Sequence, residues 1–341
     1  MSNVKKLKGF KLANHTSLRI GGMAQTVCEI SSPVDIQDFI LEFGNNDFFV
    51  LGGGSNIVAP DHEIKTPIAL MKIVKQTTKL DNDFIEITAG AGINWDEFVE
   101  DVVDQGYAGI ETLSGIPGTI GATPIQNVGA YGSEVKSTIK SLQIVDGSTG
   151  KIRQLTNEEL KFGYRTSILK NMKSKFIIEN ITFRFKKSKE SNLTNYPEVA
   201  KFLKVNPGSL VPIKELRKAI LEIRKSKGMV LNPLDSDTFS VGSFFINPVL
   251  PKNEIPENAP IYDAPDGKNK TSAAWLIEQA GFNKGYKLNN ANISNKHTLA
   301  ICNSGKASAQ EIIALAEKIK SGVLDKFKIE LQIEPKILKI S

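Results

Sequence analysis

The chain has 341 residues, which exceeds one typical domain and allows a substantial core, so we expect two or three domains. Hydrophobic residues make up 40% of the chain, but no apolar run approaches the roughly twenty residues that span a bilayer, and the N-terminal segment lacks the apolar stretch of a signal peptide. The net charge of +6 is dispersed, which argues against nucleic-acid binding and favours small polyanionic ligands. We therefore expect a soluble cytoplasmic monomer with no membrane or nucleic-acid partner.

The few cysteines and histidines do not suggest a disulfide or a metal site. Cys28 and Cys302 lie far apart, each within an apolar stretch, which is typical of buried free thiols. His15, His62 and His297 are scattered and lack the spacing of metal ligands. We expect neither a disulfide nor a bound metal.

Short strands alternate with helices in the N-terminal part. Ser32 and Pro33 have the pattern of an N-cap followed by a first-turn proline, and apolar residues then recur at helical spacing. The sequence predicts a second helix that begins after Asn94 and ends at Gly106. Strands are predicted at 48–51, 57–58, 68–71 and 84–88, followed by a hairpin of 139–145 with 152–155 and a long strand at 177–185.

A main boundary is predicted near residue 227. Residues 186–196 are polar and are expected to leave the compact body, and a helix is predicted at 213–227. Upstream, Thr156 and Glu159 have the spacing of a capping box. Beyond the boundary, the sequence predicts strands at 240–245, 299–302 and 328–334, a helix at 272–280, and a helix that begins after Ser308.

The segment 115–132, which reads GIPGTIGATPIQNVGAYG, is the most informative feature of the chain. Its five glycines and two prolines are incompatible with a regular packed element. Gln126, Asn127 and Tyr131 supply polar groups for a planar, hydrogen-bonding partner. Interspersed isoleucines distinguish the segment from a flexible linker, which would be polar throughout. The segment therefore predicts a loop built around a ligand.

A second glycine-rich segment, GGGSN at 52–56, directly follows the strand predicted at 48–51. Successive backbone N–H groups in such a turn form a concavity for phosphate oxygens. No Gly-Lys-Ser/Thr follows, so the segment is not a P-loop, and it lacks the third glycine and helix of a Rossmann turn. A tight hairpin would explain GGGSN equally well by itself. Two such segments about sixty residues apart suggest a dinucleotide lying across both loops.

Five segments follow one another along the chain: GGGSN, IPGTIGATPIQNVGAYG, FGYRTS at 162–167, VGSFFINP at 241–248 and IEP at 333–335. Together and in this order they resemble the UDP-N-acetylenolpyruvoylglucosamine reductase family of peptidoglycan synthesis. The resemblance covers nearly the whole chain and implies an α+β fold. It implies a FAD-binding body of two α+β subdomains of the vanillyl-alcohol-oxidase (PCMH) type at 1–72 and 73–227, and a smaller C-terminal α+β substrate domain at 228–341.

The resemblance also implies a flavoenzyme that uses FAD and NADPH for cell-wall biogenesis, and hence for cell shape and cell division. NADPH passes hydride to FAD, and the reduced flavin passes it to the enolpyruvyl ether of UDP-N-acetylglucosamine, which yields UDP-N-acetylmuramate. Hydride addition places negative charge on the carbon next to the substrate carboxylate. One group must therefore stabilise that charge, and another must protonate the carbon.

Three residues match the catalytic positions of this family. Arg165 suits the stabilisation of the enolate-like charge, because a guanidinium stays charged and presents paired donors. The resemblance implies that Ser243 donates the proton, although a serine hydroxyl has no acidity near neutral pH. It further implies that Glu334 faces the substrate carboxylate, whose charge should favour the protonated form of Glu334.

The remaining site residues fall into two predicted groups. Those expected to bind FAD are Gly52, Gly53, Gly54, Ser55, Asn56, Ile116, Pro117, Gly118, Gly121, Thr123, Gln126, Asn127, Gly129, Ala130, Tyr131 and Gly132. By resemblance, the nucleotide and diphosphate end of the substrate is assigned to Tyr196, Lys227, Asn247, Tyr262 and Lys270. The tyrosine at 196 matches a subgroup of the family in which a mobile tyrosine loop closes over the uridine diphosphate.

Two other functions are compatible with parts of this pattern. A FAD-dependent oxidase of the same flavin fold often tethers its flavin covalently, and His62 is the candidate for that role. A non-catalytic module that binds a UDP-sugar or flavin would have no reason to retain Arg165, Ser243 and Glu334 together. Acid precipitation distinguishes covalent from dissociable flavin.

Overall fold

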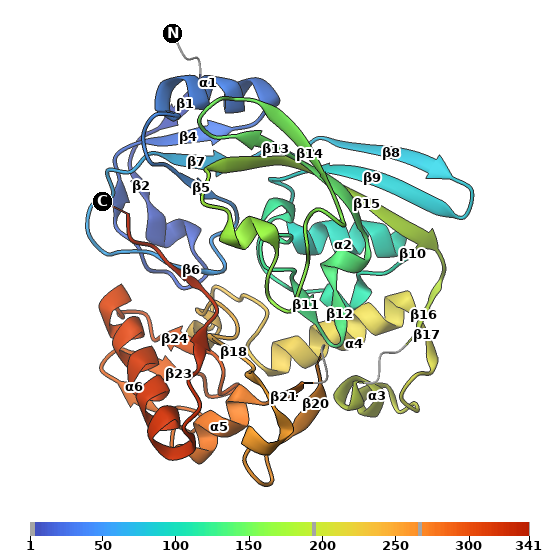
Figure 1. Ribbon diagram of the computed structural model, residues 1–341, viewed down its shortest axis with the longest axis vertical. Coiled ribbons are helices and arrows are strands. Elements are labelled where there is room, and N and C mark those ends of the chain that lie inside the picture. Colours follow the sequence, from blue (N-terminus) through green and yellow to red (C-terminus); the bar gives the residue numbers. More distant parts are fainter. Residues whose placement is uncertain (1–3, 193–195, 265–267, 341) are drawn as a thin grey trace. The chain divides into compact units, whose positions relative to one another are not determined.

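The computed structural model describes residues 4–192, 196–264 and 268–340 (Figure 1). These residues fall into two compact units, each assembled from separated stretches of the chain. The first unit comprises Met1–Phe10, Ala24–Gly53 and Lys65–Lys225, and the second comprises Lys11–Met23, Gly54–Ile64 and Ser226–Ser341. The short strands β2 (Phe10–Lys11) and β3 (Met23–Ala24) pair where the chain leaves the first unit and returns to it.

Both units combine helices with mostly antiparallel sheets, so the predicted α+β class is confirmed. In the first unit, a four-stranded sheet has the order β1-β4-β7-β5. Its strands are β1 (Lys5–Leu7), β4 (Val27–Ile30), β5 (Phe49–Leu51) and β7 (Ile68–Met71). The helix α1 (Pro33–Phe43) follows β4 and begins with a capping box between Ser32 and Asp35, which satisfies N–H groups that the first turn leaves without helical partners.

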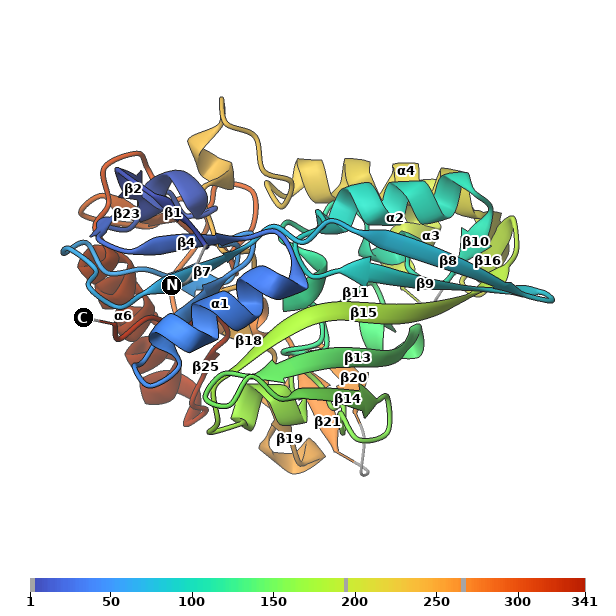
Figure 2. The ribbon, with the colours of Figure 1, turned by 90° about the horizontal axis from the view of Figure 1, so that it is seen from above.

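A six-stranded sheet provides most of the first unit. Its order is β14-β13-β15-β9-β8, with β10 paired to β15. The strands are β8 (Gln76–Asp81), β9 (Phe84–Gly90), β10 (Tyr107–Ala108), β13 (Ile139–Asp146), β14 (Ile152–Thr156) and β15 (Phe176–Lys187). Figure 2 shows the helix α2 (Trp95–Asp104) along one face of this sheet. Asn94 caps α2 by accepting the N–H groups of the first turn.

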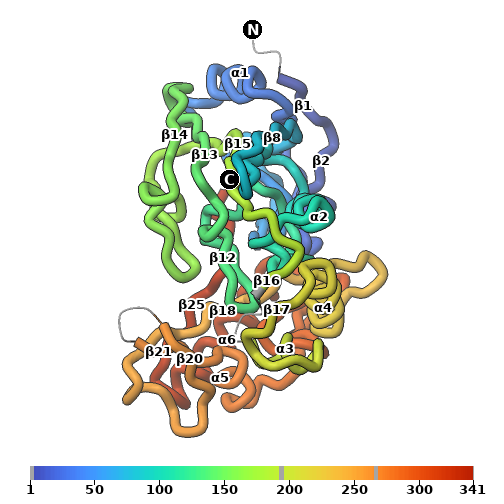
Figure 3. Tube along the Cα trace, turned by 90° about the vertical axis from the view of Figure 1, so that its right-hand side faces the viewer, coloured from blue at the N-terminus to red at the C-terminus, as the bar shows by residue number. Residues whose placement is uncertain are grey.

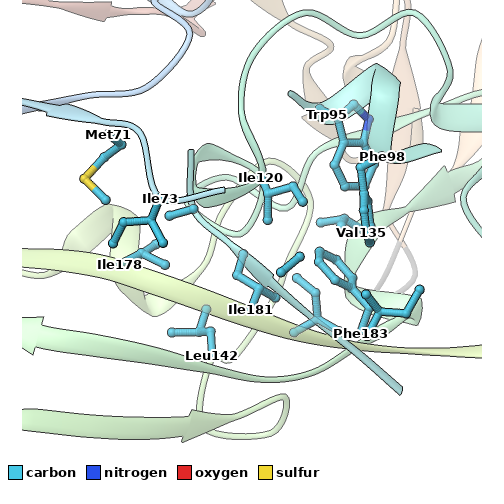
Figure 4. Close-up of a cluster of buried hydrophobic side chains, with 14 of the residues drawn as sticks. Met71, Ile73, Trp95, Phe98, Ile120, Val135, Leu142, Ile178, Ile181 and Phe183 are labelled. Carbon is cyan, nitrogen blue, oxygen red and sulfur yellow. The ribbon is translucent and has the colours of Figure 1, made fainter. Parts of the chain in front are cut away.

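The core of the first unit forms where α2 meets the sheet. Trp95 and Phe98 of α2 pack against Phe183 of β15, with ring centroids 6.2 and 5.0 Å from that of Phe183 (Figure 4). Ile120, from the glycine-rich segment 115–132, is fully buried in the same cluster. The apolar residues of that segment therefore tie it to the core, and a flexible linker is excluded.

Short elements complete the first unit. They are β11 (Gly129–Ala130), β12 (Ser133–Glu134), β16 (Glu190–Asn192), β17 (Leu210–Pro212), α3 (Pro197–Leu203), α4 (Ile213–Ser226), and the 3-10 turns η2 (Glu111–Leu113), η3 (Ile120–Ala122), η4 (Val135–Ser137) and η5 (Ile168–Asn171). Figure 3 shows α3 and α4 next to each other beside β16 and β17. A small separate core fills the space between them and includes Val199, Val211 and Ile220.

The second unit has its own core around α6 (Ala309–Phe327), which packs on β23 and β24. Its strands are β6 (Ile57–Val58), β18 (Phe245–Ile246), β19 (Val249–Leu250), β20 (Ile261–Asp263), β21 (Asn269–Thr271), β22 (Lys287–Leu288), β23 (Ala291–Ile293), β24 (Ile301–Asn303), β25 (Gln332–Ile333) and β26 (Lys336–Ile337). The remaining helical elements are α5 (Ala273–Gln279), η1 (Leu12–His15), η6 (Ser236–Thr238) and η7 (Lys252–Glu254). Leu18, Ile20 and Val58 join this core from the N-terminal half of the chain.

The helices predicted at capped positions are confirmed, whereas two predicted strands are too long. The strand predicted at 240–245 is observed as Phe245–Ile246. Residues 240–244 are not part of it, because they bond to several separate segments. Only Gln332–Ile333 is a strand within the predicted 328–334, since Lys328 ends α6 in the left-handed conformation. Thr156 and Glu159 do form reciprocal hydrogen bonds, but these close a turn rather than open a helix. Within the polar segment predicted at 186–196, residues 193–195 lie outside the described residues.

Candidate active site

The first half of the glycine-rich segment runs along the loop that precedes α2. The N–H of Trp95 donates to the carbonyl of Gly118 at 3.1 Å, and the N–H of Gly121 donates to the carbonyl of Ala91 at 2.9 Å. The N–H of Ile120 likewise donates to Ile93. These bonds fix the backbone that the sequence predicts to bind a ligand.

The two glycine-rich segments lie against each other. A Cβ at Gly53 would lie 2.6 Å from the Cα of Gly118, and a Cβ at Gly52 would lie 2.4 Å from Oγ1 of Thr119. Real Cβ atoms do not approach so closely, so glycine permits both the backbone contact at Gly53 and the contact of Gly52 with the side chain of Thr119. The predicted juxtaposition of the two segments is therefore present. Gly52, Gly53 and Gly118 therefore serve the packing of the two segments as well as any contact with a ligand.

The third predicted motif, at 162–167, also lies on the glycine-rich segment. Nδ2 of Asn127 donates to the carbonyl of Gly163 at 3.0 Å, and Oγ of Ser167 donates to the carbonyl of Ile125 at 2.8 Å. Arg165 has a positive φ of 53° and donates from Nη2 to the carbonyl of Gly129 at 2.8 Å. The structure therefore brings Arg165 together with the predicted cofactor loop.

Tyr131 connects this loop to the small core between α3 and α4. It has a positive φ of 50°, its side chain is only 8% exposed, and it packs with Val199 and Ile220. Its ring meets that of Tyr196 edge to face at 5.2 Å. Burial raises the pKa of Tyr131 to about 12, although the positive charge of Arg224 acts in the opposite direction. A predicted cofactor residue and a predicted substrate residue are thus direct neighbours.

In the second unit, the structure brings Ser243 and Glu334 together. The strands β18 and β25 pair antiparallel, with Phe245 opposite Ile333. One step further along, the N–H of Glu334 donates to the carbonyl of Phe244 at 2.9 Å. Ser243 therefore directly precedes the residue that faces Glu334. Both side chains are partly exposed, whereas Phe244 is fully buried and anchors the loop.

The residues predicted to bind the nucleotide end of the substrate have separate local roles. Tyr262 of β20 and Lys270 of β21 are opposite each other across an antiparallel pair, so their side chains are neighbours. Oδ1 of Asn247 accepts the N–H of Ala273 at 2.9 Å and thereby supports the start of α5. Lys227 lies in the turn directly after α4.

Most of the predicted cofactor residues cluster in the first unit, where the two glycine segments and the 162–167 motif meet. These are Gly52, Gly53, Ile116, Pro117, Gly118, Gly121, Thr123, Gln126, Asn127, Gly129, Ala130, Tyr131 and Gly132. Gly54, Ser55 and Asn56 belong to the second unit. Next to Gly52, Oγ1 of Thr119 is buried without a hydrogen-bond partner among the described residues. A side-chain-free backbone surface beside such a hydroxyl fits a large planar cofactor with phosphate oxygens.

Sequence patterns did not reveal one ion pair that supports the loop. Arg217 of α4 is almost fully buried and donates from Nη1 to Oδ1 of Asp96 at 2.6 Å. The same Oδ1 accepts the N–H of Gly115, the first residue of the glycine-rich segment, at 2.6 Å. The arginine within the amphipathic stretch 213–226 was the available signal, since a charge on a buried helix face requires a partner.

Other candidates from the sequence play no part in this arrangement. His62 is exposed, and its Nδ1 lies 2.9 Å from the carbonyl of the adjacent Glu63. Both cysteines are buried and unbonded to each other. Within the part of the chain that the structure describes, no cluster of three metal-ligating side chains occurs. In that part, no helix has both the length and the apolar composition needed to cross a membrane.

Two family models match the chain. Residues 24–156 match an FAD binding domain, and this range contains both glycine-rich segments. Residues 232–338 match the C-terminal domain of UDP-N-acetylenolpyruvoylglucosamine reductase, a range that contains Ser243 and Glu334.

Relatives with the same name match over nearly the whole length. The UDP-N-acetylenolpyruvoylglucosamine reductase of Thermobifida fusca is 40% identical over 97% of both chains, and that of Mycolicibacterium smegmatis is 40% identical over 99% of this chain and 97% of the relative. The crystal structure of the reductase from Thermus caldophilus is 22% identical, covers 99% of both chains and has a TM-score of 0.66, which shows a shared fold. The chain belongs to the UDP-N-acetylenolpyruvoylglucosamine reductase family.

Proposed function

We propose that the chain reduces the enolpyruvyl group of UDP-N-acetylglucosamine enolpyruvate to give UDP-N-acetylmuramate, with electrons from NADPH, in peptidoglycan precursor synthesis. The observation that carries this proposal is the full-length match, at about 40% identity, to reductases named for that substrate. FAD supplies hydride to the substrate when it is bound. The segments at 52–56 and 115–132 would hold it through backbone N–H groups, since glycine leaves those groups accessible.

Arg165 is proposed to stabilise the negative charge that develops beside the substrate carboxylate. Its bond to the carbonyl of Gly129 holds the guanidinium against the cofactor loop before substrate arrives. A prepositioned charge stabilises a developing enolate without reorganisation during the reaction. Lysine at this position would keep the charge but lose the paired planar donors.

Ser243 is proposed to give the proton to the substrate carbon, with Glu334 beside it facing the substrate carboxylate. The bond between Glu334 and Phe244 keeps Ser243 and Glu334 close together beside the small sheet of β18 and β25. The hydroxyl of Ser243 can act as a proton donor only if the acceptor is strongly basic, and the carbanion formed by hydride addition meets that condition.

The other end of the substrate is assigned to Tyr196, Lys227, Asn247, Tyr262 and Lys270. Lysine ammonium groups can attract a diphosphate, and the adjacent Tyr262 and Lys270 offer a hydroxyl and a cation on one sheet surface. Action as a cytoplasmic monomer stays a prediction, which cell fractionation and size-exclusion chromatography can check.

An anaerobic experiment tests the function. The flavin-loaded protein is reduced with NADPH, and UDP-N-acetylglucosamine enolpyruvate is then added while flavin absorbance is followed. Return of the oxidised flavin spectrum, together with formation of UDP-N-acetylmuramate, is the expected result. An oxidase would stay reduced until oxygen entered, and a binding module would not be reduced by NADPH at a useful rate.

Replacement of Ser243 separates the two half-reactions. Ser243→Ala should leave flavin reduction by NADPH unchanged but slow reoxidation by the substrate by about a hundredfold, the scale of general acid catalysis. Ser304→Ala is a suitable control, because it removes an exposed hydroxyl of the same unit that bonds only to the carbonyl of Asn290 at 2.6 Å. Wild-type reoxidation rates in Ser243→Ala, measured by stopped-flow absorbance, would remove Ser243 from the mechanism.

A further inference from the structure

A buried serine outside every predicted motif bonds to both functional segments of the second unit. Ser17 is 4% exposed, and its Oγ donates to the carbonyl of Ser240 at 2.6 Å. Its backbone N–H donates to the carbonyl of Gly54 at 3.1 Å. Oγ also lies 3.4 Å from the carbonyl of Ser55. The short side-chain bond of Ser17 thus holds the segment before Ser243, while its backbone N–H and the longer side-chain contact hold the GGGSN turn.

The bond to Ser240 bears directly on the backbone of Ser243. The hydroxyl of Ser240 accepts the N–H of Gly242 at 3.2 Å, and this bond closes a tight side-chain turn over residues 240–242. On the other side of Ser243, the N–H of Phe244 donates to the carbonyl of Leu299 at 2.7 Å. Ser243 therefore lies between two fixed points, and the hydroxyl of Ser17 holds the upstream point together with the antiparallel bridge between Ser240 and Cys302.

The GGGSN turn is equally constrained by the segment that carries Ser17. Gly54 has a φ of +61°, and a Cβ at this position would lie 2.0 Å from the carbonyl oxygen of His15. Any other residue at 54 would force the two backbones apart. The segment 15–17 therefore contacts both the GGGSN turn and the loop that leads to Ser243.

We propose that Ser17 is a positioning residue that sets the location of the Ser243 hydroxyl relative to the GGGSN turn. This inference rests on the proposed function, in which Ser243 supplies a proton. Proton donation depends on distance, and a displacement of about 1 Å at such a step can cost about a hundredfold in rate. Loss of the Ser17 hydroxyl leaves the buried carbonyl of Ser240 without this donor, so we expect the loop to shift.

The two bonds of Ser17 make a selective experiment possible. Ser17→Ala removes the side-chain bond to Ser240 and the longer contact with the carbonyl of Ser55, but keeps the backbone bond to Gly54. In the flavin-loaded enzyme we expect flavin content and reduction by NADPH within about twofold of wild type, because the cofactor turn retains its contact. Reoxidation by UDP-N-acetylglucosamine enolpyruvate should be at least tenfold slower, with the loss in kcat rather than in KM.

Two further variants distinguish positioning from general destabilisation. Ser17→Thr retains a hydroxyl and should restore reoxidation to within about threefold of wild type. Thr16→Val is the matched control, since Thr16 is also 4% exposed but, among the described residues, its hydroxyl bonds within the local turn, to the carbonyl of Ile20 at 3.0 Å and from the N–H of Ile20 at 3.2 Å. It should lower thermal stability at least as much as Ser17→Ala and leave the ratio of the two half-reaction rates unchanged.

The inference is overturned if Ser17→Ala slows both half-reactions equally, or if Thr16→Val produces the same selective loss. Should Ser17→Ala not fold, Ser17→Cys provides the same test, because a thiol has a similar shape but is a weak donor. Failure of the proposed function would appear differently. In that case the wild-type enzyme itself would not be reoxidised by the enolpyruvyl substrate.

Discussion

The two regions that carry the proposed site are built in different ways. In the first unit, segments 52–53 and 115–132 meet backbone to backbone, and missing side chains make the contact possible. In the second unit, the loop 240–244 has only one glycine; it accepts hydrogen bonds from Ser17 and Glu334 and donates one to the carbonyl of Leu299. A side-chain atom added at a glycine should disrupt the first region, whereas removal of a hydrogen-bond donor should disrupt the second.

The largest effect should come from an added atom in the first region. Gly53→Ala places a methyl group 2.6 Å from the Cα of Gly118, and relief requires the two cofactor segments to separate. We expect the flavin bound per protein to fall at least tenfold, as measured by absorbance after gel filtration. Gly106→Ala is the control, because its Cβ would have no atom within 4 Å. It should cost about 1 kcal/mol for the positive φ and keep its flavin. A fully yellow Gly53→Ala protein would contradict the tight contact.

A smaller effect should follow from removal of a long-range bond in the second region. Asn303 is 3% exposed, donates from Nδ2 to the carbonyl of Leu18 at 3.1 Å, and accepts the N–H groups of Gly305 and Ala307 at 2.8 Å. Asn303→Ala should lower the free energy of unfolding by about 3 kcal/mol, because the buried carbonyl of Leu18 and two N–H groups in part-buried bonds lose their partner.

Asn292 provides the comparison for Asn303 within the same hairpin. It is 6% exposed, its Nδ2 donates to the carbonyl of Ile293 at 3.0 Å, and its Oδ1 has no hydrogen-bond partner among the described residues. Asn292→Ala should therefore cost about 1 kcal/mol or less in urea unfolding. Equal losses of unfolding free energy in the two variants would show that the long-range bond of Asn303 adds nothing to stability.

The smallest effect concerns the alkaline stability of the first region. Burial raises the pKa of Tyr131 from its ordinary value of 10.0 to about 12. Between these values the unfolded chain loses the phenolic proton of Tyr131 while the folded chain keeps it. The contribution of Tyr131 to the free energy of unfolding is therefore complete below pH 10 and is lost as the pH rises toward 12. Tyr131→Phe should therefore show a shallower fall of the urea midpoint from pH 9 to 11. Parallel curves for the two proteins would exclude this contribution.

Local sequence patterns predicted the features that depend on neighbouring residues. Ser32, Asn94 and Ser308 begin helices at the predicted positions, because each cap bonds to N–H groups two or three residues away. The glycine-rich segments were identified for a similar reason, since their glycines lie close together in the sequence and can be recognised without knowledge of the fold. Their mutual contact followed from two such loops sharing one expected ligand.

Long-range contacts escaped the sequence analysis. Nothing around Ser17 indicates a bond to Ser240, which is 223 positions away. The pair of Arg217 with Asp96 spans 121 positions and was missed for the same reason. The predicted strand at 240–245 was too long because residues 240–244 bond to several separate segments, which the local sequence does not indicate.

The sequence by itself determined the capped helices and the two glycine-rich loops, because these rest on short-range steric and hydrogen-bonding preferences, and the resemblance of its motifs indicated the family and the α+β class. The tertiary structure alone decided that the stretches 11–23 and 54–64 fold with the C-terminal stretch Ser226–Ser341, and that Ser17 holds the loop of Ser243. A buried carbonyl accepts any donor that packing brings within reach. The identity of that donor is fixed by the whole fold, which no local pattern contains.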